Sequence, residues 1–306
     1  MEVIDIHAIT QVDSSGPSYV DGRPCFSPDG KTVLFERSGG GISLAEFWSV
    51  SIDKASVETV YYTSDNYNCL RAAWSWNPHQ KNNQIAFSAN YKNGISKIML
   101  LDAGGVSNSA KELIIKGYQA NIKLSYPAWY ASSNADEETL LITDYNALNL
   151  IKATTHGEFL GVVSSGTKWS GMGTVSAISP NVIAYAGQSI STEGYDQNVN
   201  QIWIQRVGAA PTLFSSKERD TIGRAPWISP DGSIMAFEAL SNGSSGNMQI
   251  FLKQIGKSPY NDPIISVSDA THPSQHAKFS PDGTKLVWMQ TTARGKTQIF
   301  MGTIHM

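Results

Sequence analysis

The sequence predicts an all-β protein, a β-propeller of six four-stranded antiparallel blades, because one hairpin motif recurs along the whole chain. The full Ser-Pro-Asp-Gly turn occurs three times, at 27–30, 229–232 and 280–283. A short apolar run precedes each turn, and a run rich in β-branched and aromatic residues follows it. Proline presets φ in such a turn, while aspartate and glycine supply turn hydrogen bonds and a permissive backbone. We therefore expect a tight hairpin in each copy.

The spacing of the copies supports a true repeat. The six copies align on the apolar residue before the turn serine, which is Phe26, Trp74, Trp129, Ile178, Ile228 and Phe279. The intervals between these positions are 48, 55, 49, 50 and 51 residues. Copies two to four lack the complete motif, but chance matches would not keep so regular a spacing.

Each repeat contains more than a hairpin. A third strand is expected at 46–51, 97–101, 148–152, 201–205, 249–253 and 298–302. A weaker fourth strand is expected at 58–63, 112–116, 159–164, 211–215 and 264–267. The sixth repeat has no fourth strand of its own, whereas the strand-like segment 2–10 precedes the first repeat.

The N-terminal segment is therefore expected to complete the last blade and close the ring, since an unpaired edge strand would otherwise remain exposed. The whole chain, 1–306, is interpreted as a single propeller domain. Its blades are expected at about 20–65, 70–117, 124–165, 174–216, 222–268 and 274–306, the last together with 2–10.

The hairpin at 24–30, Pro-Cys-Phe-Ser-Pro-Asp-Gly, and its near copy at 226–232 resemble the TolB-like family of β-propellers. The resemblance covers the whole chain through its periodicity, although the strict motif appears in three of six repeats. The family includes periplasmic proteins that bind partner proteins and peptides, propeller modules attached to peptidases, and metal-dependent oligogalacturonate lyases. The resemblance therefore implies the fold and leaves the function open.

Composition excludes several classes of function. The net charge is −3, charged residues make up 16% of the chain, and no Lys/Arg-rich run occurs, which argues against a nucleic-acid partner. No apolar run is long enough for a membrane span. Segment 1–10 has no signal-peptide pattern, so we expect a cytoplasmic protein, or a periplasmic or secreted one if this is a mature form. Cys25 and Cys69 lack metal-site spacing and are interpreted as buried thiols.

Candidate ligand contacts come from the start of each first strand, three positions before the aligned apolar residue. These positions hold Arg23, Arg71, Tyr126, Val175, Ala225 and His276, with Arg224 one position out of register. Their side chains are expected near the mouth of the central channel, on the face opposite the uniform turns. Arginines there would suit a carboxylate, because guanidinium binds it in bidentate fashion. Alternatively, each arginine pairs with an aspartate such as Asp21, Asp65 or Asp220 and staples blades together.

Two histidines invite a metal hypothesis. Oligogalacturonate lyases resemble this chain in carrying histidines just ahead of a Phe-Ser-Pro-Asp-Gly turn, where this chain has His272 and His276. His276 matches that pattern, but Ser274 stands where the second histidine is expected. A divalent ion needs three or four ligands, so an ordinary channel-lining histidine is the alternative for His276.

Our leading hypothesis is a non-enzymatic module that holds a peptide or protein segment, or an acidic ligand, at the loop face and channel mouth. No zinc-protease, nucleophile-elbow, phosphate-loop or dinucleotide motif occurs, so no catalytic residue is assigned, although the question of an enzyme stays open. One alternative is a metal-assisted enzyme on acidic sugars, using His276 and an arginine. Another is a carbohydrate-binding lectin that stacks sugars on the loop aromatics Trp169 and Tyr195. These rings could instead cap the blade ends.

Overall fold

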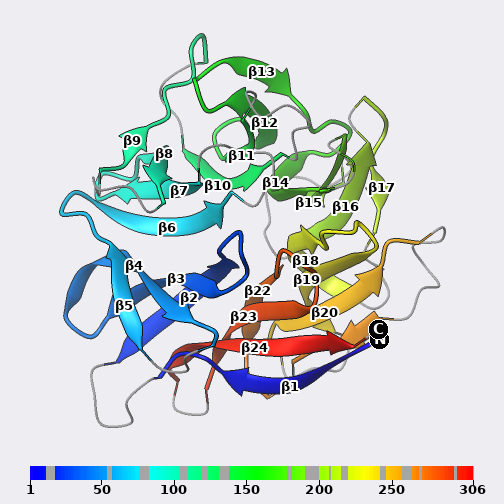
Figure 1. Cartoon of the computed structure of the whole chain (residues 1–306). Coiled ribbons are helices and arrows are strands. Elements are labelled where there is room, and N and C mark those ends of the chain that lie inside the picture. The colour runs from blue at the N-terminus through cyan, green and yellow to red at the C-terminus, as the bar shows by residue number, and fades with distance from the viewer. Residues whose placement is uncertain are drawn as a thin grey trace.

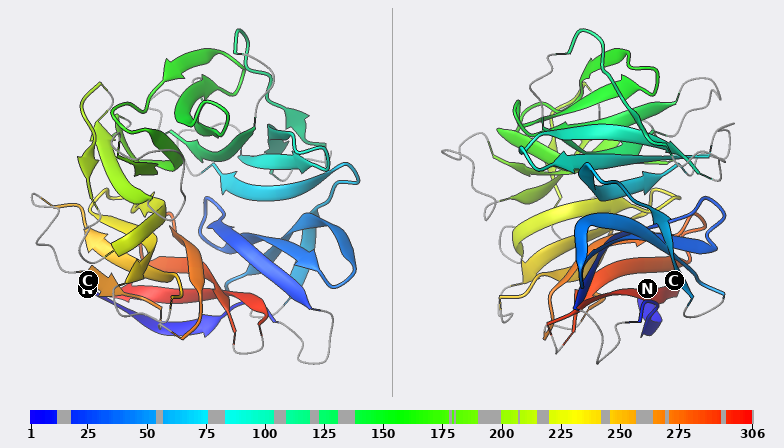
Figure 2. Two further views of the ribbon diagram at one scale, coloured as in Figure 1. Left: turned by 180° about the vertical axis from the view of Figure 1, so that it is seen from behind. Right: turned by 90° about the vertical axis from the view of Figure 1, so that its left-hand side faces the viewer.

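The fold consists of β-strands arranged around a central axis (Figure 1). The computed structural model describes residues 1–11, 18–53, 57–75, 83–103, 109–118, 123–130, 138–177, 179, 181–189, 200–206, 208–214, 220–241, 246–256, 264–268, 271–292 and 295–305. In this described part of the chain, no helix is long and apolar enough to cross a membrane. The two ends of the chain lie next to each other at the rim of the molecule (Figure 2).

The second to fifth repeats each form a separate four-stranded antiparallel sheet. The second repeat consists of β6 (Tyr67–Trp74), β7 (Gln84–Tyr91), β8 (Ser96–Asp102) and β9 (Lys111–Glu112), and the third of β10 (Leu124–Trp129), β11 (Thr139–Asp144), β12 (Asn149–Thr154) and β13 (Phe159–Val162). The fourth consists of β14 (Trp169–Val175), β15 (Val182–Gln188), β16 (Gln201–Arg206) and β17 (Thr212–Leu213), and the fifth of β18 (Asp220–Ile228), β19 (Ile234–Ser241), β20 (Gln249–Gln254) and β21 (Ile264–Ser266).

The first and last repeats are joined in one eight-stranded sheet. The first repeat contributes β2 (Tyr19–Phe26), β3 (Thr32–Gly39), β4 (Ile42–Ser51) and β5 (Glu58–Tyr62), and the last contributes β22 (Ser274–Phe279), β23 (Lys285–Thr291) and β24 (Thr297–His305). β2 pairs in parallel with β24 at Val20 and Thr297. The prediction of six separate blades is therefore wrong: the described strands form four separate blades and one double-width sheet. The number of repeats in the sequence does not reveal the pairing of β2 with β24, because this pairing depends on how close the ends of the two strands lie in the folded chain.

The N-terminal strand β1 (Glu2–Ala8) is the eighth strand of that sheet and pairs antiparallel with β24. The expectation that the N-terminal segment completes the last repeat is confirmed. The junction continues past β1, where the Ile9 backbone N–H donates to the Ile299 carbonyl at 2.8 Å. Thr10 Oγ1 accepts the Ile299 N–H at 3.0 Å, and the Thr10 carbonyl accepts Gln298 Nε2 at 2.8 Å.

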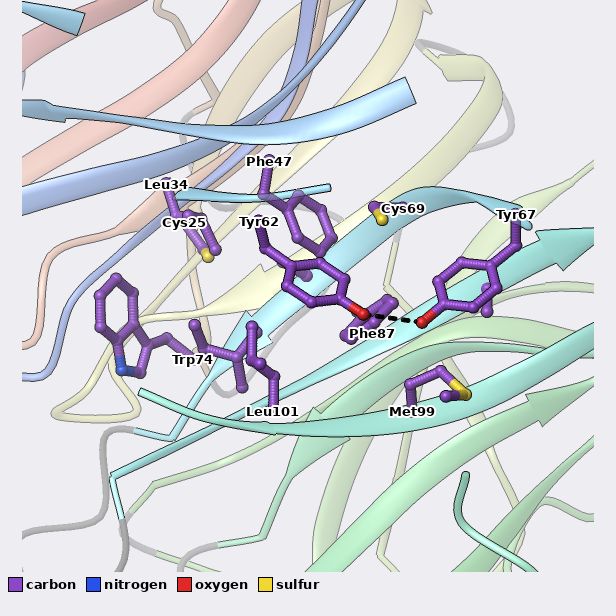
Figure 3. Close-up of a cluster of buried hydrophobic side chains, with 13 residues drawn as sticks. Cys25, Leu34, Phe47, Tyr62, Tyr67, Cys69, Trp74, Phe87, Met99 and Leu101 are labelled. Carbon is purple, nitrogen blue, oxygen red and sulfur yellow. Dashed lines mark hydrogen bonds between the residues drawn. The ribbon is translucent and has the colours of Figure 1, made fainter. Parts of the chain in front are cut away.

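Apolar clusters fill the spaces between successive repeats around the ring. Figure 3 shows the cluster between the first and second repeats, where Phe47 meets Phe87 edge-on at 5.2 Å between ring centroids. At its edge, the hydroxyls of Tyr62 and Tyr67 share a hydrogen bond of 2.8 Å. The second strand of each repeat is buried on both faces, as for Val33 to Phe35, because a neighbouring sheet packs on either side.

The Ser-Pro-Asp-Gly turns have the expected geometry. Ser27 Oγ donates to Asp29 Oδ1 at 2.6 Å and accepts the Thr32 N–H at 3.0 Å, while Gly30 adopts a left-handed φ of 70°. The Ser27 hydroxyl is the main reason that the pKa of Asp29 lies below its usual value. The turns that begin at Ser229 and Ser280 have the same Ser–Asp hydrogen bond at 2.5 Å.

The fourth repeat departs from the predicted alignment. Its turn is closed by the Ser176 N–H and the Val182 carbonyl at 2.9 Å, the bond that Ser27 and Thr32 make in the first repeat. Val175 therefore takes the place assigned to Ile178, which lies outside the described residues together with Pro180. The Ser-Pro pair falls three residues later here because the turn is built differently, so alignment on that pair gave the wrong register.

Gly302 tests the closure by β1. A Cβ at this position would lie 2.5 Å from Val3 Cγ1 and 3.2 Å from Ile6 Cγ1, so β1 would have to move away from β24. We expect Gly302→Ala to lower the free energy of unfolding by about 1–3 kcal/mol, as overpacking does elsewhere. Gly22→Ala is the control, since its Cβ would meet Met289 Sδ at an ordinary 3.6 Å. Equal denaturation midpoints for the two variants would contradict this account of the closure.

Candidate functional site

Every first strand contains a two-residue bulge near its middle. The register shifts between Gly22 and Cys25, Leu70 and Ala73, Ser125 and Ala128, Gly171 and Thr174, Arg224 and Trp227, and Gln275 and Lys278. The first residue inside each bulge has a left-handed φ: 41° at Arg23, 56° at Arg71, 49° at Tyr126, 53° at Met172, 45° at Ala225 and 57° at His276. Six non-glycine residues in this region are unusual, and bulges of this kind redirect side chains.

These six bulge residues line one pocket, which we call the loop-side pocket because it lies on the side away from the Ser-Pro-Asp-Gly turns. The other lining residues are Pro127, Gly173, Pro226, Trp227, Ala277 and Lys278. Five members of the predicted ring are thus brought together. The expectation for Val175 is wrong, because the corrected register puts Met172 there. Arg224 lies beside the ring and is not among the lining residues.

The bulges are fastened to the neighbouring repeat. The backbone N–H of Arg71 donates to Glu36, that of Tyr126 to Ser88 Oγ at 3.3 Å, and that of Met172 to Thr143 Oγ1 at 3.0 Å. The His276 N–H makes the equivalent bond to Glu238. Each acceptor lies on the second strand of the preceding repeat, opposite the residue before the bulge. The bulge geometry is therefore supported from outside its own sheet.

Arg23 is held by a carboxylate. Its Nη1 atom donates to Glu36 Oε2 at 2.6 Å, and this buried partner raises the pKa of Arg23 above its usual value. The ion-pair part of that alternative therefore applies to Arg23, but the partner is Glu36 instead of an aspartate, and both residues belong to the first repeat, so the pair does not staple two blades together. Asp21 instead binds Arg37, which donates Nε and Nη2 to its two oxygens at 2.7 and 2.8 Å. Sequence analysis missed Glu36, which stands in the strand after the turn.

Arg71 has a different environment. Its guanidinium lies over the ring of Tyr126, 4.5 Å from the centroid. Among the described residues it has no carboxylate partner within ion-pair distance. An arginine stacked on an aromatic face keeps its hydrogen-bonding edge free while its position is fixed. Arg71 can therefore donate to a ligand in the loop-side pocket.

The charges around the pocket favour an anion. Burial lowers the pKa of His276 well below its usual value, and Arg23, Arg71, Lys278 and Arg224 lower it further, so this imidazole is neutral. Burial raises the pKa of Glu238 to about 7 despite Arg224 and Arg23. Among the described residues around His276, the four cationic side chains thus outnumber the two carboxylates of Glu36 and Glu238, and Glu238 is partly protonated at neutral pH.

The two histidines do not form a metal site. His276 lies in the pocket wall, whereas His272 precedes β22 and shares a hydrogen bond of 2.7 Å with Thr271 Oγ1. Within the described ranges, no group of three or more His, Cys, Asp or Glu side chains is arranged to hold a metal ion. The four cations that face His276 would also repel a divalent cation. The residues present do not fit the metal that the lyase resemblance implied.

The two aromatic residues predicted for sugar stacking do not form a platform. Trp169 is completely buried at the start of β14, and its ring packs beside Gly171. Its face is therefore closed to a sugar, and the stacking role predicted for it is wrong. Tyr195 lies outside the described residues.

Comparison with known proteins finds likeness at the level of structure. No protein-family model matches the sequence, and no curated protein matches it. A putative TolB from Agrobacterium tumefaciens superimposes with a TM-score of 0.62 at 14% identity, over 94% of this chain and 91% of the other. TolB from Acinetobacter baumannii gives a TM-score of 0.56 at 13% identity, over 95% of this chain and 65% of the other. The chain has a TolB-like β-propeller fold.

The TolB-like fold also occurs in an enzyme. An oligogalacturonate lyase from Vibrio parahaemolyticus superimposes with a TM-score of 0.55 at 13% identity, over 100% of this chain and 98% of the other. Identities this low show the fold alone. Because a TolB and a lyase share it, the function of this chain has to be argued from its own pocket.

Glu238 provides a test of the pocket electrostatics. Its pKa in the native state is about 7, against 4.5 for an ordinary glutamate, so the native state holds a proton that the unfolded chain releases in this range. The Glu238 contribution to stability is therefore lost as the pH rises from about 4.5 to about 7. In chemical denaturation across this range, wild type should lose stability relative to Glu238→Gln. Parallel curves would contradict the raised pKa, since the other titrating groups are common to both proteins.

Proposed function

We propose that this chain is a non-catalytic binding module whose loop-side pocket holds a carboxylate on a segment of a partner protein or peptide. Arg71 is the principal contact, and Arg23, Arg224, Tyr126 and His276 complete the surroundings. The TolB structures with the same fold are compatible with this role. We argue it from the pocket, because the fold is shared by proteins with different functions.

The state of Arg71 carries the proposal. The Arg71 guanidinium is held over the Tyr126 ring and has no carboxylate partner among the described residues. Because its side chain is already ordered, it loses less conformational entropy when a ligand binds. Arg23, beside it, already forms an ion pair with Glu36. Arg23 would therefore attract an anionic ligand through its positive charge more than through direct hydrogen bonds. A carboxylate would meet Arg71 in bidentate geometry within a site that already carries excess positive charge.

The position of the pocket favours a small group on a larger ligand. Its wall is formed by bulge residues from the first strands, so a ligand group would enter it as a side chain or a chain terminus, and a folded domain would stay outside. Neutral His276 can donate or accept one hydrogen bond beside the carboxylate. The body of the partner would then rest on the surrounding loop face, where connections between repeats such as 63–66 and 163–168 lie.

An acidic sugar is the second ligand to consider, because a uronate carries the same carboxylate. The lyase of similar fold is the reason to include it. Among the described residues, His276 does not belong to any group of three or more side chains that could hold a metal ion, so we treat a uronate as a bound ligand of this chain. No contact of the described residues favours a neutral-sugar lectin.

The test is a comparison of paired peptides. Short peptides with a free C-terminal carboxylate and the same peptides as amides would be measured by calorimetry, with digalacturonate as a third ligand. We expect the free acid to bind more tightly than the amide, and Arg71→Ala to weaken it by about tenfold or more, as loss of a charged hydrogen bond does. Arg206→Ala is the matched control, because Arg206 is exposed at the end of β16.

Three outcomes would contradict the proposal. Equal binding of acid and amide would show that the carboxylate is not recognised. An unchanged affinity in Arg71→Ala would remove the assigned contact. Turnover of digalacturonate that requires added Mn²⁺ and disappears in His276→Ala would favour the lyase alternative instead.

A further inference from the structure

The channel has a second mouth with a different chemistry. A second pocket, here called the turn-side pocket, opens beside the Ser-Pro-Asp-Gly turns of the fifth and sixth repeats. It is lined by Cys25, Phe26, Ala73, Trp74, Val175, Ala177, Trp227, Ile228, Pro230, Lys278, Phe279, Ser280 and Pro281. Trp227 and Lys278 also line the loop-side pocket, so these two side chains stand between the two mouths.

The wall of the turn-side pocket is apolar and aromatic. Phe26, Trp74 and Phe279 are each less than 10% exposed, so their rings are held in place by packing behind them. The Ser280 hydroxyl is already engaged, since it donates to Asp282 Oδ1 at 2.5 Å and accepts the Lys285 N–H at 2.9 Å. This wall suits an apolar body with aromatic or aliphatic character.

Lys278 is the one charged side chain among these lining residues. Its Nζ donates to the Ala72 carbonyl at 2.9 Å and lies 4.8 Å from the centroid of the Trp227 ring. It forms no ion pair with a described residue. An ammonium group has three donors, so two remain for a ligand. Burial lowers the pKa of Lys278, which means that its charge is poorly compensated by the protein.

Small residues make the room around this ammonium group. The position two residues after each left-handed bulge residue faces this pocket in four repeats. It holds the small residues Cys25 and Ala73 in the first two repeats, and the large residues Trp227 and Lys278 in the last two. The result is an apolar chamber with a single cation at its inner end.

We propose that the turn-side pocket is a second binding site, which takes a monocarboxylate with an apolar body and binds the carboxylate at Lys278. The body lies against Phe26, Trp74 and Phe279, and its carboxylate accepts hydrogen bonds from Nζ. One ammonium group without a neighbouring arginine or lysine in the wall matches a single negative charge better than a phosphate. The site is separate from the proposed carboxylate contact at Arg71.

Decanoate is the probe, with decanol and decyltrimethylammonium as charge controls of equal chain length. Calorimetry should show decanoate binding more tightly than either. Lys278→Met keeps the length of the side chain and removes its charge, so we expect it to weaken decanoate by roughly tenfold while leaving decanol unchanged. Lys278→Arg should retain part of the preference. Lys31→Met serves as the matched control, since Lys31 is an exposed lysine beside the first turn.

Equal affinity for decanoate and decanol, or no change in Lys278→Met, would overturn the proposal. Ala73→Leu gives an independent check if the lysine variants unfold, because it fills the pocket and should abolish binding of both ligands. Folding of every variant is verified by thermal unfolding. Arg71→Ala should leave decanoate binding unchanged, so failure of this proposal and failure of the proposed function give different results.

Discussion

The left-handed bulge in each first strand is the constraint on which the channel depends. A non-glycine residue in this conformation costs about 1–2 kcal/mol, and this chain has one in every repeat. Four of the bulges are fastened by a backbone N–H that donates to the preceding repeat, through Glu36, Ser88, Thr143 and Glu238. The packing between repeats therefore maintains a backbone conformation that a single isolated sheet has no reason to adopt. The same conformation turns six side chains toward one pocket.

Two consequences for chemistry follow from this geometry. The bulge residues themselves line the loop-side pocket, where, among the described residues, positive charge exceeds negative charge and Arg71 lies over Tyr126 without a carboxylate partner. The residues two positions later reach the next level of the channel, where Lys278 and Trp227 separate this pocket from the apolar turn-side pocket. One backbone feature, repeated around the ring, thus places a pocket with several charged side chains on one side and a largely apolar pocket on the other.

The features that each repeat specifies by its own residues could be predicted from the sequence. The turn motif and its spacing identified the hairpins, and the missing strand of the last repeat led to the pairing of β1 with β24. What depends on neighbouring repeats was not predictable. The bridge between Val20 and Thr297 and the hydrogen bond from the Arg71 N–H to Glu36 both result from contacts across repeats. The fourth ring position was assigned to Val175 instead of Met172, because the Ser-Pro pair is displaced within an atypical turn.

Ala225 offers the most direct measurement, because its side chain has no polar group and a substitution there acts mainly through the backbone. Its φ is 45°, a region that glycine enters without strain and β-branched residues avoid. Chemical denaturation of Ala225→Gly and Ala225→Val should show glycine at least as stable as alanine and valine clearly less stable. The opposite order, with glycine weakening the strand and valine strengthening it, is the behaviour of an ordinary β-strand and would contradict the bulge on which this account depends.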